Sequence, residues 1–351
     1  MMKLQVTAIA CATAALACGI GAAAPAHSAR HEVRPGESIQ KAVDAARAGD
    51  TVALAAGTYR QSVTITKPGI TLEGAGPRTV ISPAAGTAQG TCARLGAGVC
   101  VLGTGTKAVD GVRVRALTVS GFSKNGLWAS GTDHLVLDRV VAEKNKVRGI
   151  AAEKSVRSVI THVTARDNGD AGVFVTNLAN AEGGAADTHG TVVEDSTFTG
   201  NATGLTLRRV RHLFVRGNDV SANCAGVFVV GDESKPLAGA MTISHNRIHE
   251  NNKFCPATAR LSAVQGAGIV LTGAEDTVIR DNSVTGNAGT APMSGGIVLF
   301  KSFVGVHNSH NTVRDNVLDG NKPADLANGE TGTVNAIDHN ECSASLPAGM
   351  C

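Results

Sequence analysis

The chain has 351 residues, in which 32 lysine and arginine residues nearly balance 29 aspartate and glutamate residues. A charge balance this even does not predict nucleic acid or a membrane surface as the target. Aromatic residues make up 3% of the chain, with one tryptophan and one tyrosine, which argues against a long aromatic platform for stacking sugar rings.

Residues 1–29 have the pattern of a secretory signal peptide. Lys3 precedes an alanine-rich apolar run, and small residues follow it. Cleavage after Ala26 or Ala29 would release a mature, extracellular protein, and we take its folded domain as residues 30–351.

A lipid anchor on Cys18 is the alternative, although Leu16 lies two residues before this cysteine rather than the expected three. No later apolar run approaches the ~20 residues that a membrane span requires. We therefore expect no membrane span in the mature chain.

Six cysteines remain after cleavage, in pairs that are close in sequence. The pairs are Cys92 with Cys100, Cys224 with Cys255, and Cys342 with Cys351. An even number of cysteines in an exported chain indicates disulfides rather than a metal or redox site. The local pairing is favoured because each bond would close an insertion or a terminus; buried free thiols are the alternative.

Residues 37–48 have the features of a short amphipathic helix. Ser38 suits the N-cap, apolar residues follow at helical spacing, and Gly49 comes after the end. Segments 51–54, 62–65 and 69–74 then alternate apolar and polar residues as half-buried strands do. A stack of repeats exposes its last apolar layer, so we expect the helix to cap the N-terminal end of such a stack.

One short phrase recurs along the rest of the chain: a glycine followed by alternating aliphatic residues. Its copies begin at Gly126, Gly149, Gly172, Gly204, Gly226, Gly268 and Gly296. The shortest spacing, from Gly204 to Gly226, is 22 residues, and the longer spacings have the length of that unit plus an insertion. A repeat of this length predicts a solenoid.

Asparagines recur in the turns of this repeat. The phrase Asn-x-φ-x-x-Asn occupies 246–251, 282–287 and 316–321. Asparagine tolerates the left-handed backbone region, and its amide can bond to an identical neighbour one turn of the solenoid away, at a strand spacing of about 4.8 Å. The pattern predicts a structural ladder of stacked asparagines.

The segments 34–43, 49–52 and 57–59, followed by units of the form Asn-x-x-Gly-φ-x-φ, resemble the secreted right-handed parallel β-helix proteins of the pectin lyase-like superfamily. The resemblance covers nearly the whole mature chain. It implies an all-β fold, a right-handed parallel β-helix (single-stranded solenoid) over residues 30–351 with a short N-terminal capping helix. A disulfide-closed segment, 336–351, would end it.

The superfamily includes polysaccharide lyases, glycoside hydrolases, uronan epimerases, a copper-enzyme maturation factor and proteins with no known reaction, so the fold does not fix the function. The first hypothesis is a protein that binds or processes an acidic polysaccharide or cell-wall glycan, by a lyase-like or epimerase-like reaction if it is catalytic. The second is a non-catalytic surface or matrix protein that binds a glycan or a protein. The third is a copper-related maturation factor. We expect a monomer that does not bind nucleic acid.

By this resemblance, the strand after each repeated glycine corresponds to the sheet that floors the substrate cleft in the family's enzymes. The residue after each glycine is aliphatic, so this position and the one two residues later point inward, and the residues between them point outward. Candidate substrate-binding residues at this face are Trp128, Glu153, Phe174, Phe228, Phe300 and Lys301.

Insertions would rise along both edges of this sheet. They lie at 177–190, 231–240 and 301–310 after the strand, and at 252–266 and 288–294 before it. A large exposed apolar patch marks either a binding site or a covered surface. Two arrangements are therefore open: a loop-walled groove over the middle and C-terminal units, or loops folded onto the apolar columns as a second core.

A lyase or epimerase that acts on a uronic acid needs a cation for the carboxylate and a base for the adjacent proton. Arg208 is the candidate cation on the outer face, with a salt bridge between units as its alternative role. Asp187 and His189 are candidates for acid and base, although both residue types are common in loops. Calcium is a possible cofactor, since such enzymes often use it to neutralise the carboxylate.

Several family motifs are missing. These are the paired aspartates and Gly-His-Gly of the hydrolases, the Arg-x-Pro-x-x-Arg phrase of calcium-dependent pectate lyases and the Asp-Pro-His of alginate epimerases. Glycoside hydrolysis needs two carboxylates flanking one bond, and the outer face supplies no close pair. The histidine pairs 245/249 and 307/310 have no clustered third ligand, so we predict no metal site from them.

Overall fold

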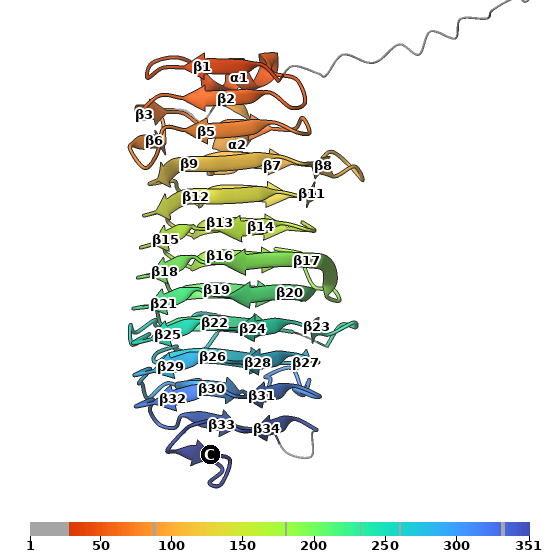
Figure 1. Ribbon diagram of the computed structural model, residues 1–351, viewed down its shortest axis with the longest axis vertical. Coiled ribbons are helices and arrows are strands. Elements are labelled where there is room, and N and C mark those ends of the chain that lie inside the picture. Colours follow the sequence, from red (N-terminus) through yellow and green to blue (C-terminus); the bar gives the residue numbers. More distant parts are fainter. Residues whose placement is uncertain (1–27, 87–88, 180, 232, 260, 331–333) are drawn as a thin grey trace, which may run out of the picture.

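The structure, a computed structural model, describes residues 28–351 except 87–88, 180, 232, 260 and 331–333. The chain winds into a long solenoid of stacked turns, which we call rungs. Its N-terminal rungs lie at one end and its C-terminus lies at the other (Figure 1). This is the parallel β-helix that the repeat predicts. Residues 1–27, and with them nearly all of the predicted signal peptide, lie outside the described residues. In the described part, no helix is long and apolar enough to span a membrane.

The strands that begin at the repeated glycines belong to one sheet, which we call the repeat sheet. Within the described residues it has 11 parallel strands in the order of the chain. They are β4 (Val63–Ile65), β7 (Val99–Leu102), β10 (Asn125–Ser130), β13 (Arg148–Glu153), β16 (Ala171–Thr176), β19 (Thr203–Arg208), β22 (Ala225–Val230), β26 (Ala267–Thr272), β30 (Gly295–Leu299), β33 (Leu326–Asn328) and β35 (Ser345–Leu346). A Cβ on Gly226 would lie 2.6 Å from the carbonyl oxygen of Gly268, so the close approach of successive rungs requires glycine here.

A second sheet, which has 22 strands in the described part of the chain, forms the other two sides of the solenoid. Its strands are β1 (Arg30–Val33), β2 (Thr51–Leu54), β3 (Gly57–Arg60), β5 (Thr71–Gly74), β6 (Thr79–Ser82), β9 (Arg113–Ser120), β12 (Val136–Glu143), β14 (Val159–Thr161), β15 (Thr164–Arg166), β17 (Ala186–Glu194), β18 (Thr197–Thr199), β20 (Val210–Arg216), β21 (Asp219–Ser221), β23 (Ala238–Gly239), β24 (Thr242–Ser244), β25 (Arg247–His249), β27 (Ala274–Glu275), β28 (Val278–Arg280), β29 (Ser283–Thr285), β31 (Thr312–Arg314), β32 (Val317–Asp319) and β34 (Ala336–Asp338). β12 bends at Arg139 (φ 52°) and pairs with β14 before the bend and with β15 after it. The short strands β8 (Val109–Asp110) and β11 (Thr132–Asp133) pair separately.

Inward side chains from all three sides form one core. The aliphatic residues that follow the repeated glycines are fully buried: Leu127, Ile150, Val173, Leu205, Val227, Ile269 and Ile297. The residues two positions later are buried as well: Ala129, Ala152, Val175, Leu207, Val229, Leu271 and Leu299. The predicted alternation of inward and outward positions is therefore confirmed.

The predicted asparagine ladder runs along the corner before the repeat sheet. Its members are Asn145, Asn168, Asn201, Asn223, Asn251, Asn287 and Asn321, each at most 1% exposed. Each Nδ2 donates to the Oδ1 of the next asparagine at 2.8 to 3.2 Å, and Asp325 accepts the last of these bonds at 2.9 Å. A second ladder follows another corner through Asn218, Asn246, Asn282, Asn316 and Asn340. The structural role predicted for these residues is confirmed.

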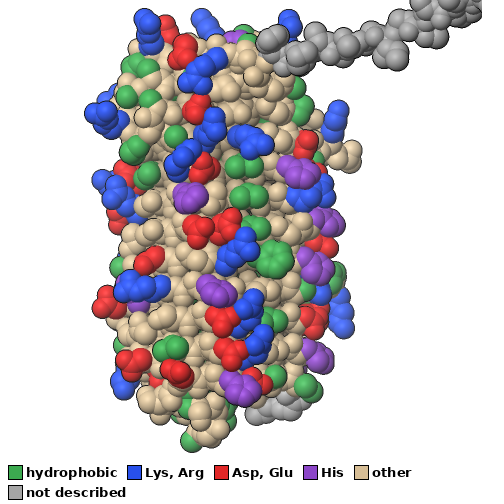
Figure 2. Space-filling model, viewed as in Figure 1, with side chains coloured by type: hydrophobic (Ala, Val, Ile, Leu, Met, Phe, Trp, Pro, Cys, Tyr) green, Lys and Arg blue, Asp and Glu red, His purple; other side chains and the backbone are tan. Residues whose placement is uncertain are grey.

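Histidines occupy many of the exposed corners. In the described part of the chain, those with a positive φ, between 48° and 57°, are His134, His162, His189, His212, His245, His310 and His339. Histidine is several-fold enriched in this left-handed region, as asparagine and aspartate are. Figure 2 shows histidines spaced along the solenoid in lines, among acidic side chains. Turn geometry alone accounts for a histidine at such a position.

The N-terminal end is capped by α1 (Ile39–Ala45), which is shorter than the predicted segment 37–48. Ser38 is the N-cap, and Ala46 is already extended (φ −67°, ψ 151°). The chain turns there because Asp50 accepts the backbone N–H of Arg47 at 2.8 Å. That bond, together with the His31 side chain and the Ala29 backbone N–H, lowers the pKa of Asp50 to about 2.

Three disulfides join the cysteines in the local pairing that the sequence predicts. They link Cys92 with Cys100, Cys224 with Cys255, and Cys342 with Cys351, with Cα atoms 5.2 to 5.9 Å apart. The first fixes α2 (Gly90–Arg94) against the repeat sheet, the second anchors the insertion 252–266, and the third closes the C-terminal segment.

Candidate functional site

The outer face of the repeat sheet is covered over its middle rungs. Phe174 and Phe228 are 3% and 6% exposed, whereas Phe300, next to the end of β30, is half-buried. Phe174 packs with Ala151 and with Ala179 of the insertion 177–190. An open groove over these rungs is therefore wrong, because the loops fold down and form a second core there.

Two of the predicted site residues hold the insertion 177–190 in place. The Arg208 guanidinium donates from Nη2 to the carbonyl oxygens of Leu178 and Ala179 at 2.6 and 2.7 Å. Glu153 Oε1 accepts the backbone N–H of Ala179 at 2.9 Å. The ring of Phe174 lies beneath, with its centroid 5.3 Å from the guanidinium carbon of Arg208. The chain itself thus bridges Glu153 and Arg208, and both residues anchor the loop.

The insertion 252–266 covers the next rungs. The disulfide from Cys224 ties it to the start of β22, and Val264 packs in one cluster with Phe228, Val270 and Met293. Phe300 packs against the edge of this cluster. The cover is therefore built from both edges of the sheet, and it ends near Phe300.

A pocket of about 510 Å³, which we call the C-terminal pocket, lies where this cover ends. It is lined by Glu182, Arg208, Arg209, Phe228, Val230, Gly231, Glu233, Leu261, Thr272, Met293, Phe300, Ser302, Phe303 and Val304. Phe300 and Phe303 meet edge to face with ring centroids 5.3 Å apart, and Phe303 is 69% exposed. An apolar floor beside an exposed aromatic ring suits the apolar face of a sugar ring.

Among the described residues that line the C-terminal pocket, the charged ones are two arginines and two glutamates. Arg209 donates to the Glu182 carboxylate and to the carbonyl oxygen of Ala181. Arg208 is anchored to the loop as described, and Glu233 is exposed. The charges of these four described residues balance, and both arginines already bond to the protein itself.

Asp187 and His189 lie in β17 of the second sheet, at a corner of the solenoid. Asp187 is in register with Arg211, accepts the backbone N–H of His189 at 2.7 Å and lies 2.8 Å from Nδ1 of His212. Burial acts to raise the pKa of Asp187, but the bonds from His189 and His212 outweigh it, so this pKa lies below its ordinary value. Asp187 is an ionised partner of two corner histidines, and neither it nor His189 lines the C-terminal pocket.

The sequence reasoning missed His212 as the partner of Asp187. The available signal was the spacing: His189 and His212 occupy left-handed corners in consecutive rungs, with φ of 50° and 54°, where the register of β17 and β20 shifts. Residues at matching corners stack at the strand spacing. A carboxylate next to one of them is therefore within reach of both.

Two further candidates lie away from the C-terminal pocket. Trp128 is half-buried in the cluster that the Cys92–Cys100 disulfide forms beneath α2, near the N-terminal end. Lys301 is exposed and does not line the C-terminal pocket. Of the predicted set, Arg208, Phe228 and Phe300 line the C-terminal pocket, whereas Glu153 and Phe174 meet Arg208 beneath the loop.

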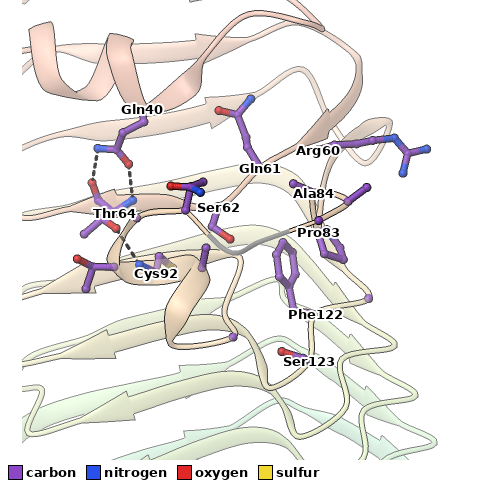
Figure 3. A pocket seen from close by; sticks show the side chains of 18 of the residues that line it. Gln40, Arg60, Gln61, Ser62, Thr64, Pro83, Ala84, Cys92, Phe122 and Ser123 are labelled. Atoms are coloured by element: carbon purple, nitrogen blue, oxygen red, sulfur yellow. Dashed lines mark hydrogen bonds between the residues drawn. The ribbon is translucent and has the colours of Figure 1, made fainter.

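A larger cavity of about 860 Å³, which we call the N-terminal pocket, lies beside the capping helix. Its walls come from the start of α1, from residues 60–64, from the segment that leads into α2, and from the turn at 121–123 (Figure 3). This cavity could not be predicted from the repeat, because it forms where non-repeating segments meet.

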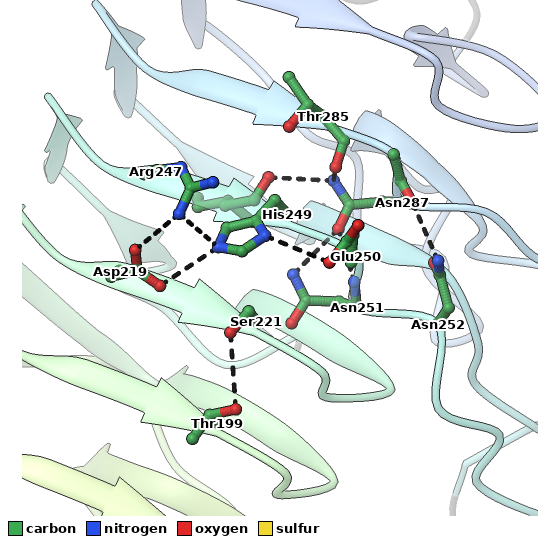
Figure 4. A network of polar contacts seen from close by, with 12 residues as sticks. Thr199, Asp219, Ser221, Arg247, His249, Glu250, Asn251, Asn252, Thr285 and Asn287 are labelled. Carbon is green, nitrogen blue, oxygen red and sulfur yellow. Dashed lines mark hydrogen bonds and ion pairs between the residues drawn. The ribbon is translucent and has the colours of Figure 1, made fainter.

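A polar network of Asp219, Arg247 and His249 lies on the second sheet. His249 Nε2 lies 3.3 Å from Asp219 and 3.0 Å from Nη1 of Arg247, and its side chain is 15% exposed (Figure 4). Arg247 also donates to Asp219 at 3.1 Å. The three side chains link neighbouring rungs, and none of them lines either pocket. The network is a rung-to-rung ion pair of the kind that stabilises stacked strands.

The described residues contain one group of three side chains spaced for a metal ion, namely Asp110, Asp133 and His134. Arg157 already donates to Asp133 at 2.8 Å, and His134 lies 3.0 Å from both carboxylates. Calcium takes six to eight oxygen ligands, which two carboxylates shared with an arginine and an imidazole do not supply. This group therefore does not fit the calcium considered from the sequence.

Residues 97–229 and 183–346 match the family described as right-handed beta helix region. The chain belongs to this family of right-handed β-helix proteins, which is the fold that the resemblance to the pectin lyase-like superfamily predicts.

No curated protein matches the chain in sequence. Among solved structures it is similar to the alginate lyase from Paenibacillus sp. str. FPU-7, with a TM-score of 0.58 and 15% identity over 89% of this chain and 99% of that one. It is also similar to the periplasmic alginate epimerase AlgG (TM-score 0.59, 13% identity, 89% of this chain and 73% of that one). A third is the DFA-IIIase from Arthrobacter chlorophenolicus A6 (TM-score 0.56, 14% identity, 89% and 83%). Identities this low show a shared fold alone.

Proposed function

We propose that the protein binds an acidic polysaccharide along the outer face of the repeat sheet and holds sugar units in the C-terminal pocket. The observation that carries this proposal is the position of the pocket. It is an accessible part of the sheet that the resemblance assigns to the substrate cleft, and loops from both edges of that sheet wall it. The exposed ring of Phe303 beside Phe300 offers a stacking surface at its mouth.

The choice of an acidic chain is supported by two observations. Arg208 and Arg209 line the pocket, and a guanidinium group can pair with a carboxylate in addition to the bonds that these two arginines make within the protein. Two of the structural neighbours are named as an alginate lyase and an alginate epimerase, and alginate is a polymer of uronic acids. Uronate polymers are therefore the first class of ligand to test.

Binding is better supported than catalysis. Arg208 holds the loop carbonyls of Leu178 and Ala179, and Asp187 pairs with corner histidines outside the pocket lining. The lyase-like or epimerase-like reaction is the second candidate, favoured by the activities in the names of the neighbours. We also propose that the protein is secreted, since three disulfides fit an oxidising compartment.

The binding proposal is tested by titration calorimetry with alginate and pectate oligomers, and with a neutral glucan oligomer of the same length. We expect the uronate oligomers to bind more tightly. Phe303→Ala should weaken their binding by roughly tenfold through loss of ring stacking. Phe254→Ala is the matched control, because Phe254 is 59% exposed and does not line the pocket. Equal effects of the two changes, or equal affinity for the neutral oligomer, would count against the proposal.

The catalytic candidate is tested separately on the same alginate and pectate, with and without calcium. Elimination produces unsaturated uronates, which absorb in the ultraviolet, and epimerisation changes the proton NMR signals of the sugar units. If the Asp187→Asn and His189→Gln variants keep the activity, these residues are not the acid and the base of the reaction. Binding without either signal leaves the non-catalytic protein as the function.

A further inference from the structure

The N-terminal pocket is lined by positive charge without negative charge. Arg60, at the end of β3, and Lys146 line it, and the described residues of its lining include no aspartate or glutamate. Both side chains are exposed, and within the described residues neither makes a side-chain hydrogen bond or ion pair. Figure 3 shows Arg60 at the rim, extending outward. A cavity lined by one sign of charge concentrates oppositely charged ligands.

The inner wall of this pocket is fixed by hydrogen bonds. The Gln40 side chain accepts the backbone N–H of Thr64 at 2.8 Å and donates to its carbonyl oxygen at 3.0 Å. Ser62 donates to the carbonyl oxygen of Ala97 at 2.8 Å. The Cys92 backbone N–H donates to the Thr64 hydroxyl at 3.2 Å, close to the disulfide that holds α2. These groups are used internally, so this inner wall is fixed without a ligand.

The groups left for a ligand are at the mouth. Gln89 and Ser123 are exposed lining residues, and in the described part of the chain neither side chain is hydrogen-bonded. Together with Arg60 and Lys146 they present two cations, an amide and a hydroxyl around one cavity. Carboxylates match the cations, and sugar hydroxyls match the amide and the hydroxyl.

We propose that the N-terminal pocket is a second binding site, for a short anionic saccharide whose carboxylates pair with Arg60 and Lys146. The volume of about 860 Å³ falls in the range of small-molecule pockets, roughly 300–1,000 Å³. The proposal shares the class of ligand with the proposed function but uses a different part of the fold. It stands or fails independently of the C-terminal pocket.

The test uses the full chain and trigalacturonate, with maltotriose as the neutral trisaccharide of equal length. The double variant Arg60→Gln and Lys146→Gln should weaken trigalacturonate binding by roughly tenfold or more, since each cation contributes a charge-assisted bond. The control double variant, Arg78→Gln and Lys107→Gln, removes the same charge from exposed positions outside the lining. It should leave the affinity within about twofold, because distant surface charges are screened by salt.

Three outcomes overturn the proposal: equal losses in the two double variants, no loss in either, or maltotriose binding as tight as that of trigalacturonate. A Phe303→Ala variant in the same titration separates the two sites. If this variant no longer binds long oligomers but still binds trigalacturonate, the N-terminal pocket binds trigalacturonate without the C-terminal pocket. If it abolishes trigalacturonate binding while the Arg60 and Lys146 variant does not, the ligand sits in the C-terminal pocket and the second site is wrong.

Discussion

The asparagine ladder and the outer face of the repeat sheet are built by neighbouring residues of the same rungs, yet they constrain the sequence differently. Asn223 is fully buried and bonds to the rungs on both sides of it, whereas Phe228, five residues later, faces a loop. In the ladder, each position is occupied by the same amide in seven successive rungs of the described chain. On the outer face, the equivalent positions hold Trp128, Ala151, Phe174, Thr206, Phe228, Val270 and Val298.

The difference follows from what each position must satisfy. A buried amide has to find a donor and an acceptor at fixed places in the adjacent rungs, so few residue types can replace it. An outward side chain has to match only the loop or ligand that covers it. The ladder therefore stabilises the fold, whereas the residues of the outer face can vary with function.

The largest effect is expected from breaking the ladder in its middle. Asn223→Ala removes buried bonds to Asn251, Phe198 and Asn201 and a partly buried bond to Ser221. Each buried polar group left unsatisfied costs about 1–3 kcal/mol, so we expect the free energy of unfolding to fall by about 3 kcal/mol or more. Denaturant unfolding followed by circular dichroism measures this loss.

The matched control for the ladder is Asn252→Ala at the adjacent, exposed residue. Its amide bonds to Gly286 and Ala288 at the surface, where water can replace both partners. We expect a loss of less than about 1 kcal/mol. Similar losses in the two variants would mean that burial in the ladder is not what makes Asn223 irreplaceable.

The next effect concerns the C-terminal end of the ladder, which depends on a carboxylate. Burial acts to raise the pKa of Asp325, but the Asn321 side chain and backbone and Ser343 donate hydrogen bonds to it, so its pKa lies below the ordinary value of 3.8. A pKa lowered by folding adds stability above the unfolded value, and this stability is lost as the pH falls through the folded value. Stability should therefore decline below about pH 4.

Asp325→Asn tests this carboxylate directly. At pH 7 its amide NH₂ would face the backbone N–H donors of Ser343 and Ala344, and we expect a loss of about 2 kcal/mol in the free energy of unfolding. Because the native carboxylate loses its advantage when protonated, the gap to the unmodified protein should narrow as the pH falls toward 3. Asp319→Asn, at an exposed position, should show neither change. A gap that does not depend on pH would contradict the assignment.

The repeat could be predicted from the sequence because its constraints are local and periodic. The repeated glycines must let one rung approach the next, and the asparagines must stack, so both recur in register with the rungs. The inward aliphatic residues recur for the same reason. The three disulfides were also within reach, since each closes a short segment.

The candidate site could be predicted only in part. Insertions have no period, so the sequence did not show that the loop at 177–190 lies on Phe174. Arg208 lies on the outer face, as the sequence pattern predicts. Its partners could not be predicted, because they are backbone carbonyl oxygens, which every residue has. The pairing of Asp187 with His212 depends on contact between rungs, and the N-terminal pocket depends on segments that do not repeat.

The smallest effect is expected on the outer face itself, where Arg208 anchors the loop. Arg208→Gln loses the bonds to Leu178 and Ala179, which are partly exposed, and we expect a loss of about 1–2 kcal/mol in the free energy of unfolding. The change should be local: amide hydrogen exchange should become faster within 177–186 and stay unchanged along the asparagine ladder. Arg216→Gln is the control, because its ion pair with Glu194 is exposed and worth less than about 1 kcal/mol. If exchange along the ladder also became faster, the outer face would share the constraint of the interior, and the contrast between the two would fail.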